Sequence, residues 1–354
     1  MDKRNLQHLW PGVPLALGSA FLFGATAPAS KILLDDIDPQ LLAGVLYLGA
    51  GVGLTAIRVS QMAFGALNRE APLRATDAPW LAAIVVFGGV IGPLLLMMGL
   101  SKTDATSGSL LLNLEGLATL GLAWLLFREH VDRKLIFGAI SIMFGAVVLS
   151  WNGAGFGLDL GAILIAGACL AWGLDNNLTR KLSSADAVVI AAIKGLAAGA
   201  INVGIAFTRG ATAPPLDVAA IGAAVGFCGV GLSLVLFILA LRHLGTARTG
   251  AYFALAPFVG AFLAVVALGE PLTVQLAAAG ALMGLGLWLH LAERHDHHHE
   301  HESLAHEHAH ISDDHHPHEH VQPNGSHSHW HLHEPVRHSH AHYPDLHHRH
   351  KHRK

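Results

Sequence analysis

The feature that most constrains this chain is a series of long apolar stretches that recurs along residues 13–292. A helix needs about 20 mostly apolar residues to cross the roughly 30 Å hydrocarbon core of a bilayer. Ten stretches meet this requirement, separated by short charged or Gly/Pro-containing loops, so the sequence predicts an all-α membrane protein with ten transmembrane helices. The stretches are residues 13–34, 39–62, 79–100, 106–127, 134–151, 159–182, 187–208, 217–241, 247–268 and 273–292.

Composition supports this class and divides the chain into two parts. Hydrophobic residues make up 52% of the chain and charged residues 13%, whereas a soluble domain averages about 25% charged residues. Residues 1–292 hold 16 basic and 15 acidic side chains, and residues 293–354 hold 6 basic, 10 acidic and 23 of the 27 His. The chain is therefore an apolar body followed by a His-rich tail, and an ordinary soluble enzyme is excluded.

Loop charges predict the orientation. If residues 1–12 are cytoplasmic, twelve Lys and Arg side chains lie in cytoplasmic loops and helix ends, and only Lys31, Lys102 and Arg209 lie outside. Cytoplasmic loops carry an excess of Lys and Arg, so this assignment is favoured. Ten spans return the chain to the same side. We therefore expect a bacterial inner (plasma) membrane protein with both termini, including the tail, in the cytoplasm.

The two halves of the body, residues 13–151 and 159–292, share weak internal similarity. Each half contains five predicted helices, an odd number, so the second must be inverted relative to the first. Inverted repeats of this type place the substrate site near the bilayer midplane. The matching positions are Phe23-Gly24 and Lys31 with Trp172-Gly173 and Arg180, Ser107-Gly108 with Thr249-Gly250, and Phe127-Arg128-Glu129 with Leu268-Gly269-Glu270.

These motifs carry a family resemblance. Residues 125–129 and 267–270 each end a helix on Glu and lead into a Gly-rich helix, and in this respect the chain resembles the EamA-type members of the drug/metabolite transporter superfamily. The resemblance implies two EamA-like inverted five-helix repeats and a transported substrate drawn from amino acids, metabolites, sugars or drugs. The family often has a Pro midway along the fourth helix. Helix 9 has Pro257, whereas Glu115 occupies the matching position of helix 4.

Glu115 is the most informative polar residue of the body. A charged carboxylate near the middle of a span costs roughly 3 kcal/mol or more. Its functional interpretation is a substrate contact or a proton-coupling group. The structural interpretation is a protonated or hydrogen-bonded carboxyl between helices, and the sequence leaves both open.

Three other polar residues are candidates for a substrate or coupling cavity. Lys194 could be the countercharge of Glu115 or an anion contact, or its long stem could reach the membrane interface. Asp175 and Asn177 belong to a run of three polar residues that covers most of a helix circumference, so at least one should face the interior. The alternative for that run is a water-exposed helix end.

Prolines and aromatic residues receive structural interpretations. Pro28 and Pro257 interrupt helices 1 and 9, where each frees a backbone carbonyl and permits a kink. Tyr252 and most of the seven Trp are interpreted as anchors at the membrane interface.

The tail is expected to be disordered without a ligand, because it has few aliphatic residues and a strong compositional bias. Neutral imidazole is a good ligand for Zn, Ni, Co and Cu. A spacing of two residues lets an extended chain offer several nitrogens to one ion. The candidate ligands are His297, His298, His299, His301, His327, His329, His331, His333, His338, His340 and His342.

The leading hypothesis is a secondary active transporter, expected to carry out proton-coupled efflux of a small metabolite or drug-like molecule. Two alternatives are a divalent metal (Zn, Ni or Co) exporter and a metal-sensing or metal-buffering membrane protein that uses the tail. No Walker motif indicates ATP use, and no catalytic arrangement indicates an enzyme. The expected partners are a small-molecule substrate and the lipid bilayer, with divalent metal ions at the tail, no nucleic acid and no required cofactor. A homodimer is left open.

Overall fold

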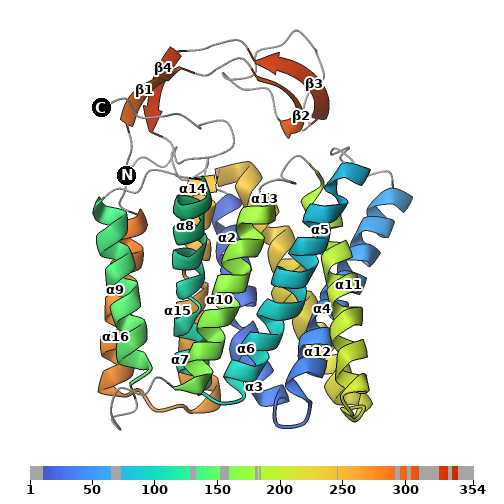
Figure 1. Ribbon diagram of the computed structural model, residues 1–354, viewed down its shortest axis with the longest axis vertical. Helices are drawn as coiled ribbons and strands as arrows, with labels where there is room; N and C mark the ends of the chain where they lie inside the picture. The colour runs from blue at the N-terminus through green and yellow to red at the C-terminus, as the bar shows by residue number, and fades with distance from the viewer. Residues whose placement is uncertain are drawn as a thin grey trace.

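The computed structural model describes residues 11–64, 73–127, 133–151, 159–179, 182, 185–244 and 246–291, and four short segments of the tail. The body is helical, and Figure 1 shows its helices side by side along a common direction. The first helices are α2 (Gly12–Gly24), α3 (Thr26–Leu33), α4 (Pro39–Ala63), α5 (Ala78–Ile84), α6 (Gly92–Leu100), α7 (Ala105–Leu111), α8 (Leu114–Phe127) and α9 (Arg133–Leu149). They are followed by α10 (Leu160–Thr179), α11 (Ala187–Thr208), α12 (Leu216–Gly226), α13 (Ser233–Leu244), α14 (Thr246–Phe253), α15 (Ala256–Leu268) and α16 (Val274–Leu291).

The chain is a multi-pass membrane protein. Within the described residues, six helical stretches are long and apolar enough to cross a bilayer. They are Gly12–Leu33, Pro39–Ala63, Ala75–Leu100, Ala105–Leu125, Val188–Thr208 and Leu216–Ala240. The other four spans expected from the sequence correspond to α10, which is 20 residues long and carries a polar run, and to the shorter apolar parts of α9, α15 and α16.

Several spans are interrupted near their middle. A short 3₁₀ turn (Ala75–Asp77) leads into α5, and a π-helical segment, η2 (Val85–Ile91), joins α5 to α6. A second π-helical segment, η4 (Phe227–Leu232), joins α12 to α13. One non-helical residue separates α2 from α3, and two non-helical residues separate α7 from α8 and α14 from α15. Such interruptions free backbone carbonyls to accept hydrogen bonds from other helices.

The prolines singled out in the sequence lie at two of these interruptions. Pro28 is the third residue of α3, and Pro257 is the second residue of α15. Because proline has no N–H, it cannot donate to the carbonyl four residues earlier, which is Gly24 for Pro28 and Phe253 for Pro257.

Glycines bring α4 and α11 into close contact. A Cβ atom on Gly195 would lie 2.7 Å from the Cα of Gly51, and one on Gly199 would lie 2.6 Å from the backbone nitrogen of Leu48. Membrane helices that meet through small residues gain close backbone packing in this way. The pair α4–α11 thus joins the first half of the body to the second.

Four segments of the His-rich tail belong to the described residues. Four segments have extended backbones: β1 (Asp296–Glu300), β2 (Leu304–His310), β3 (His327–His333) and β4 (Arg337–Ala341). They form two antiparallel ladders, β1 with β4 and β2 with β3.

Candidate functional site

A buried ion pair joins α10 to α11. The Nζ of Lys194 lies 2.5 Å from the Oδ2 of Asp175, whose residue is only 4% exposed. The hydroxyl of Thr179, one turn further along α10, donates to the other carboxylate oxygen at 3.4 Å. Lys194 lies seven residues from the start of α11, or about 10 Å along its axis. The structure thus pairs this lysine with Asp175, not with Glu115 as the sequence had suggested.

Glu115 receives a neutral partner instead of a cation. The amide of Asn176 donates to Oε1 of Glu115 at 3.0 Å and to the hydroxyl of Thr119 at 3.1 Å. Glu115 and Thr119 are four residues apart and therefore lie on one face of α8, the face turned toward α10. Glu115 is twelve residues from the end of α8, about 18 Å along the axis, which is near the middle of the span.

Asn177 ties the same two helices together. Its amide nitrogen donates to the carbonyls of Thr119, at 3.0 Å, and Gly173, at 2.8 Å. Its carbonyl oxygen is buried and has no hydrogen-bond partner. Asn177, predicted as a cavity residue, therefore connects α8 with α10 and keeps an unpaired carbonyl oxygen.

The π-helical segment η2 supplies backbone acceptors to this cluster. The carbonyl of Gly88 accepts from the hydroxyl of Tyr47 at 2.8 Å and from the indole N–H of Trp172 at 3.0 Å. The next carbonyl, that of Gly89, accepts from the amide of Asn202 at 3.1 Å. A π-helix replaces the hydrogen bonds between residues four apart by bonds between residues five apart. The carbonyls of Gly88 and Gly89 can therefore accept from side chains of α4, α10 and α11.

Gly88 also provides the space that Asp175 occupies. A Cβ atom added to Gly88 would lie 2.1 Å from Oδ2, 2.2 Å from Cγ and 2.6 Å from Oδ1 of Asp175. Only a residue without a side chain can hold this position beside the carboxylate. The ion pair with Lys194 therefore depends on a glycine from a third helix.

The charges of the cluster do not balance. It contains the carboxyls of Glu115 and Asp175 and the ammonium group of Lys194, and Asp175 already holds the lysine. A second charged carboxylate in a membrane interior needs a compensating cation or a proton. Glu115 is thus the carboxyl of the cluster whose hydrogen-bond partner is a neutral amide, whereas Asp175 is paired with a cation.

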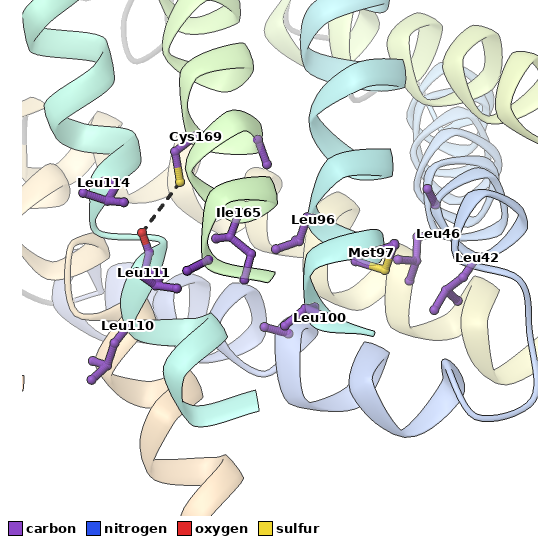
Figure 2. Close-up of a cluster of buried hydrophobic side chains, with 14 of the residues drawn as sticks. Leu42, Leu46, Leu96, Met97, Leu100, Leu110, Leu111, Leu114, Ile165 and Cys169 are labelled. Atoms are coloured by element: carbon purple, nitrogen blue, oxygen red, sulfur yellow. Dashed lines mark hydrogen bonds between the residues drawn. The ribbon is translucent and has the colours of Figure 1, made fainter. Parts of the chain in front are cut away.

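An interruption in the helix precedes Glu115. The amide of Asn113 donates to the carbonyl of Leu110 at 2.8 Å, and the Sγ of Cys169 lies 3.7 Å from the carbonyl of Leu111. Figure 2 shows this sulfur of α10 directed at the freed carbonyl, among buried leucines that pack the centre of the bundle. The carbonyls of Leu110 and Leu111 at the break between α7 and α8 therefore have nearby donors, and the break lies among apolar side chains.

A second feature is a cavity of about 450 Å³ on the side predicted to be external. Its acidic lining residues Asp104, Asp159 and Glu270 cap helix ends. Asp104 accepts from the N–H of Ser107 at 2.7 Å, and Asp159 accepts from that of Ala162 at 3.2 Å.

Glu270 makes a cross-link between the two halves at this cavity. Its carboxylate accepts from the N–H groups of Ala105 and Thr106, both at 2.7 Å, and from the Thr106 hydroxyl. Gly269, which adopts the left-handed conformation with φ of 68°, ends α15 just before it. The acids of the cavity thus have structural partners at helix ends, whereas Glu115 lies deeper, bonded to the neutral amide of Asn176.

The predicted body residues and tail residues have different outcomes. Glu115, Lys194, Asp175 and Asn177 come together around α10, which is linked to α8 by side-chain hydrogen bonds and to α11 by the ion pair of Asp175 with Lys194. Among the candidate metal ligands, His301 and His342 lie outside the described residues. The other nine candidate ligands belong to β1, β3 and β4.

Sequence reasoning missed four contributors to the cluster: Tyr47, Gly88, Trp172 and Asn202. Trp172 was interpreted with the interface anchors, yet its indole points to a backbone carbonyl inside the bundle. The Trp172-Gly173 dipeptide matches Phe23-Gly24 in the internal repeat, and this match could have indicated a position inside the bundle. Tyr47 and Asn202 are polar residues in otherwise apolar spans, the same signal that identified Glu115.

Comparison with known proteins gives three findings. The EamA-like transporter family profile matches residues 10–151 and again residues 159–292. An uncharacterized transporter of Methanothermobacter thermautotrophicus is 31% identical over 293 residues, which cover 78% of this chain and 85% of the relative. A solved crystal structure aligns with a TM-score of 0.58 at 19% identity, covering 79% of this chain and 95% of that one. At this identity the structural likeness shows the fold alone.

Proposed function

Because the chain belongs to the EamA-like transporter family, we propose that it is a secondary active transporter that works by alternating access. The family membership supports membrane transport of small solutes. We further propose that it exports a small metabolite or drug-like molecule across the bacterial inner membrane and that proton movement drives this export.

Recurring features of the two halves support an inverted-repeat architecture with ten spans. The family profile matches each half separately. The break between α7 and α8 has a counterpart between α14 and α15, and the π-helical segment η2 has a counterpart in η4. Helices of the two halves also pair, α4 with α11 and α9 with α16 (Figure 1). In this architecture, rocking of one half against the other exposes a central site to each side in turn.

The observation that carries proton coupling is the unequal charge of the buried cluster. Asp175 is held by Lys194, whereas Glu115 is held by the neutral amide of Asn176. A carboxyl with a neutral partner can be protonated without breaking an ion pair. Glu115 therefore serves as the proton carrier, and Asn176 can accompany either protonation state by rotating its amide.

Replacing Glu115 by Gln should uncouple transport from protons. Glutamine keeps the shape and a hydrogen bond to Asn176 but cannot ionise. We expect downhill exchange of the solute to persist and accumulation driven by a pH gradient to be lost. The measurement uses proteoliposomes with internal pyranine, challenged with amino acids and drug-like cations, and records internal pH together with uptake of radiolabelled solute.

The matched control is Asp36→Asn, which alters an exposed carboxyl between α3 and α4 and should leave proton movement intact. Accumulation at the wild-type level in the Glu115→Gln protein would refute the assignment. The coupling proposal would also fail if wild-type vesicles moved a solute without any accompanying pH change.

The metal-exporter and metal-sensing alternatives rest on a different region. All eleven candidate metal ligands lie within residues 293–354, after the last membrane helix. Within the residues whose side chains the structure describes, no three His, Cys, Asp or Glu side chains gather closely enough to hold a metal ion. Deletion of residues 293–354 separates the hypotheses: a solute transporter retains transport, whereas a metal exporter loses metal resistance.

A further inference from the structure

Two groups of helices form the middle of the body. In the first group, α10 packs against α5, α6 and α8, and in the second, α2 packs against α13, α14 and α15. Glycines at matching positions of the internal repeat tighten both groups. A Cβ atom on Gly173 of α10 would lie 2.8 Å from the Cβ of Ala118 in α8. One on Gly24 of α2 would lie 2.4 Å from the carbonyl oxygen of Ala256 in α15. Each group is therefore closely packed within itself.

The two groups meet at the predicted external side. There α3, which follows α2, packs against α6 and α7, and α15 packs against α7. In an inverted repeat, the matching contacts at the predicted cytoplasmic side would join α10 to α13 and α14, and α14 to α8. Among the residues that the structure describes, none of these three pairs packs to a comparable extent. A Cβ atom on Gly116 of α8 or on Gly250 of α14 would have no neighbour within 4 Å. The two groups are thus closed against each other at one side only.

Lys31 of α3 ties the second group to the end of α6. Its Nζ donates to the carbonyl oxygen of Leu100 at 2.6 Å. Leu100 is the last residue of α6, and carbonyls of the last turn of a helix have no partner within the helix. A cation at this end also interacts favourably with the helix dipole. Lys31 is therefore a specific partner for a helix end of the other group.

Glu270 ties the second group to the start of α7. It follows α15, and its carboxylate accepts from the N–H groups of Ala105 and Thr106, both at 2.7 Å, which are the first two residues of α7. The first N–H groups of a helix lack partners within it and favour an anion. Only residues 101–104 separate α6 from α7. Lys31 and Glu270 therefore hold the two ends of the same turn with opposite charges.

A buried hydroxyl opposes this closed contact. Ser109 of α7 is 1% exposed, and its hydroxyl has no hydrogen-bond partner among the described residues. A Cβ atom on Gly260 of α15 would lie 2.7 Å from this hydroxyl oxygen, so the hydroxyl belongs to the contact between α7 and α15. A buried polar group without a partner costs free energy, and separation of α7 from α15 would let water reach it. The bonds of Lys31 and Glu270 offset this cost.

We propose that Lys31 and Glu270 are a latch that holds the two groups together at the predicted external side, and that the transporter opens there when both side chains release the turn between α6 and α7. The latch presupposes the alternating access proposed above and identifies the contact that separates. The pairs α4–α11 and α9–α16 are poorly suited to separate, because their glycines bring backbones together. A Cβ atom on Gly286 of α16, for example, would lie 2.6 Å from the carbonyl oxygen of Gly138 in α9.

The latch lies on the route to Glu115. This residue follows Ala105 by 10 positions in the span formed by α7 and α8, which is about 15 Å along a helix axis. The contact of α7 with α15 therefore lies between Glu115 and the predicted external side. Separation of the groups at this contact would open a path from that side to the carboxyl, as expected when inverted repeats rock against each other.

Distances between spin labels measure the state of this contact without transport. The full-length protein is placed in lipid nanodiscs after both native cysteines are replaced by alanine. One pair of labels, at Lys102 and Leu272, spans the two groups at the predicted external side. A second pair, at Leu125 and His243, spans them at the predicted cytoplasmic side. All four positions are exposed, so labels there should not disturb the packing, and double electron–electron resonance gives both distances.

Glu270→Gln and Lys31→Met should each lengthen the external distance and shorten the cytoplasmic one. Glutamine has no charge and offers one acceptor oxygen where the carboxylate offers two, and methionine has no donor for the carbonyl of Leu100. The matched control is Asp104→Ala. It removes a carboxylate that accepts from the N–H of Ser107 at 2.7 Å in the same first turn of α7, but within the first group. Both distances should then stay as in the parent protein.

Three results would overturn the latch. The first is parental distances in both Glu270→Gln and Lys31→Met, and the second is an equal change in Asp104→Ala. The third is a longer external distance without a shorter cytoplasmic one, because alternating access requires the two sides to move in opposite senses. No solute or pH gradient is applied, so a failure of proton coupling or export in the transport assay would leave these distances unaffected.

Ser109→Ala tests the same contact in the opposite direction. The substitution removes the hydroxyl that lacks a partner in the closed contact, so it should favour the closed conformation. Added to Glu270→Gln, it should return both distances part of the way to those of the parent protein. A double variant that is as open as Glu270→Gln, or more open, would contradict the balance between this hydroxyl and the latch.

Discussion

Replacing Lys194 by Met is expected to destabilise the protein by about 3–5 kcal/mol. The substitution preserves the length of the side chain but leaves the buried carboxylate of Asp175 without its cation, and Asp175 is only 4% exposed. Asp175→Asn should have a similar effect, because it leaves the ammonium group of Lys194 without its carboxylate partner. The double variant should recover most of the loss, since it removes both charges together.

Thermal unfolding in detergent of the two single variants and the double variant measures this coupling as a double-mutant cycle. Lys102→Met is the matched control, because Lys102 lies exposed at the cavity that Glu270 also lines, and it should unfold like the wild type. Additive effects of the two core substitutions would show that the pair is not energetically coupled.

Gly88→Ala, a substitution in η2, should break the ion pair between Asp175 and Lys194. The added methyl group would lie within 2.1–2.6 Å of three atoms of the Asp175 carboxylate, so the carboxylate must move away from Lys194. Overpacking of this type costs about 1–3 kcal/mol, and the loss of the pair adds to it. We therefore expect a lower unfolding temperature together with lower transport activity.

Gly204→Ala in α11 is the control for this substitution, because a Cβ atom there has no neighbour within 4 Å. Removing glycine from a helix interior without a clash should stabilise it by up to about 1 kcal/mol. In an Asp175→Ala background, the penalty of Gly88→Ala should shrink, because the colliding carboxylate is gone. The same penalty in both backgrounds would mean that Gly88 acts through another contact.

The positions of the charged residues show how far sequence reasoning reaches. Glu115, Asp175 and Lys194 stand out because ionisable side chains are costly within apolar spans, and all three belong to one cluster. A pair of Glu115 with Lys194 was one of the arrangements that the sequence left open, and the structure pairs Asp175 with Lys194. The choice depends on the rotation and depth of α8, α10 and α11 relative to one another. These depend on contacts between helices, which the pattern of a single helix does not contain.

The sequence also gave no indication of which backbone carbonyls accept hydrogen bonds or where helices approach each other closely. The carbonyl of Gly88 attracts Tyr47 and Trp172 because η2 is π-helical, and a glycine in an apolar run gives no sign of this geometry. Trp172 shows the same limit, since an amphipathic indole suits both a membrane interface and a buried carbonyl. Only its neighbours decide between the two.

The sequence by itself determined the membrane class, the helical body and the polar residues that carry its chemistry, because the length of an apolar run and the cost of a buried charge are local properties. The tertiary structure decided which carboxyl holds the lysine, which carboxyl keeps a neutral partner, and which glycine makes room for the ion pair. These outcomes depend on contacts between segments far apart in the chain. Burial makes an unsatisfied polar group costly, and the available partners are set by how the helices and strands pack.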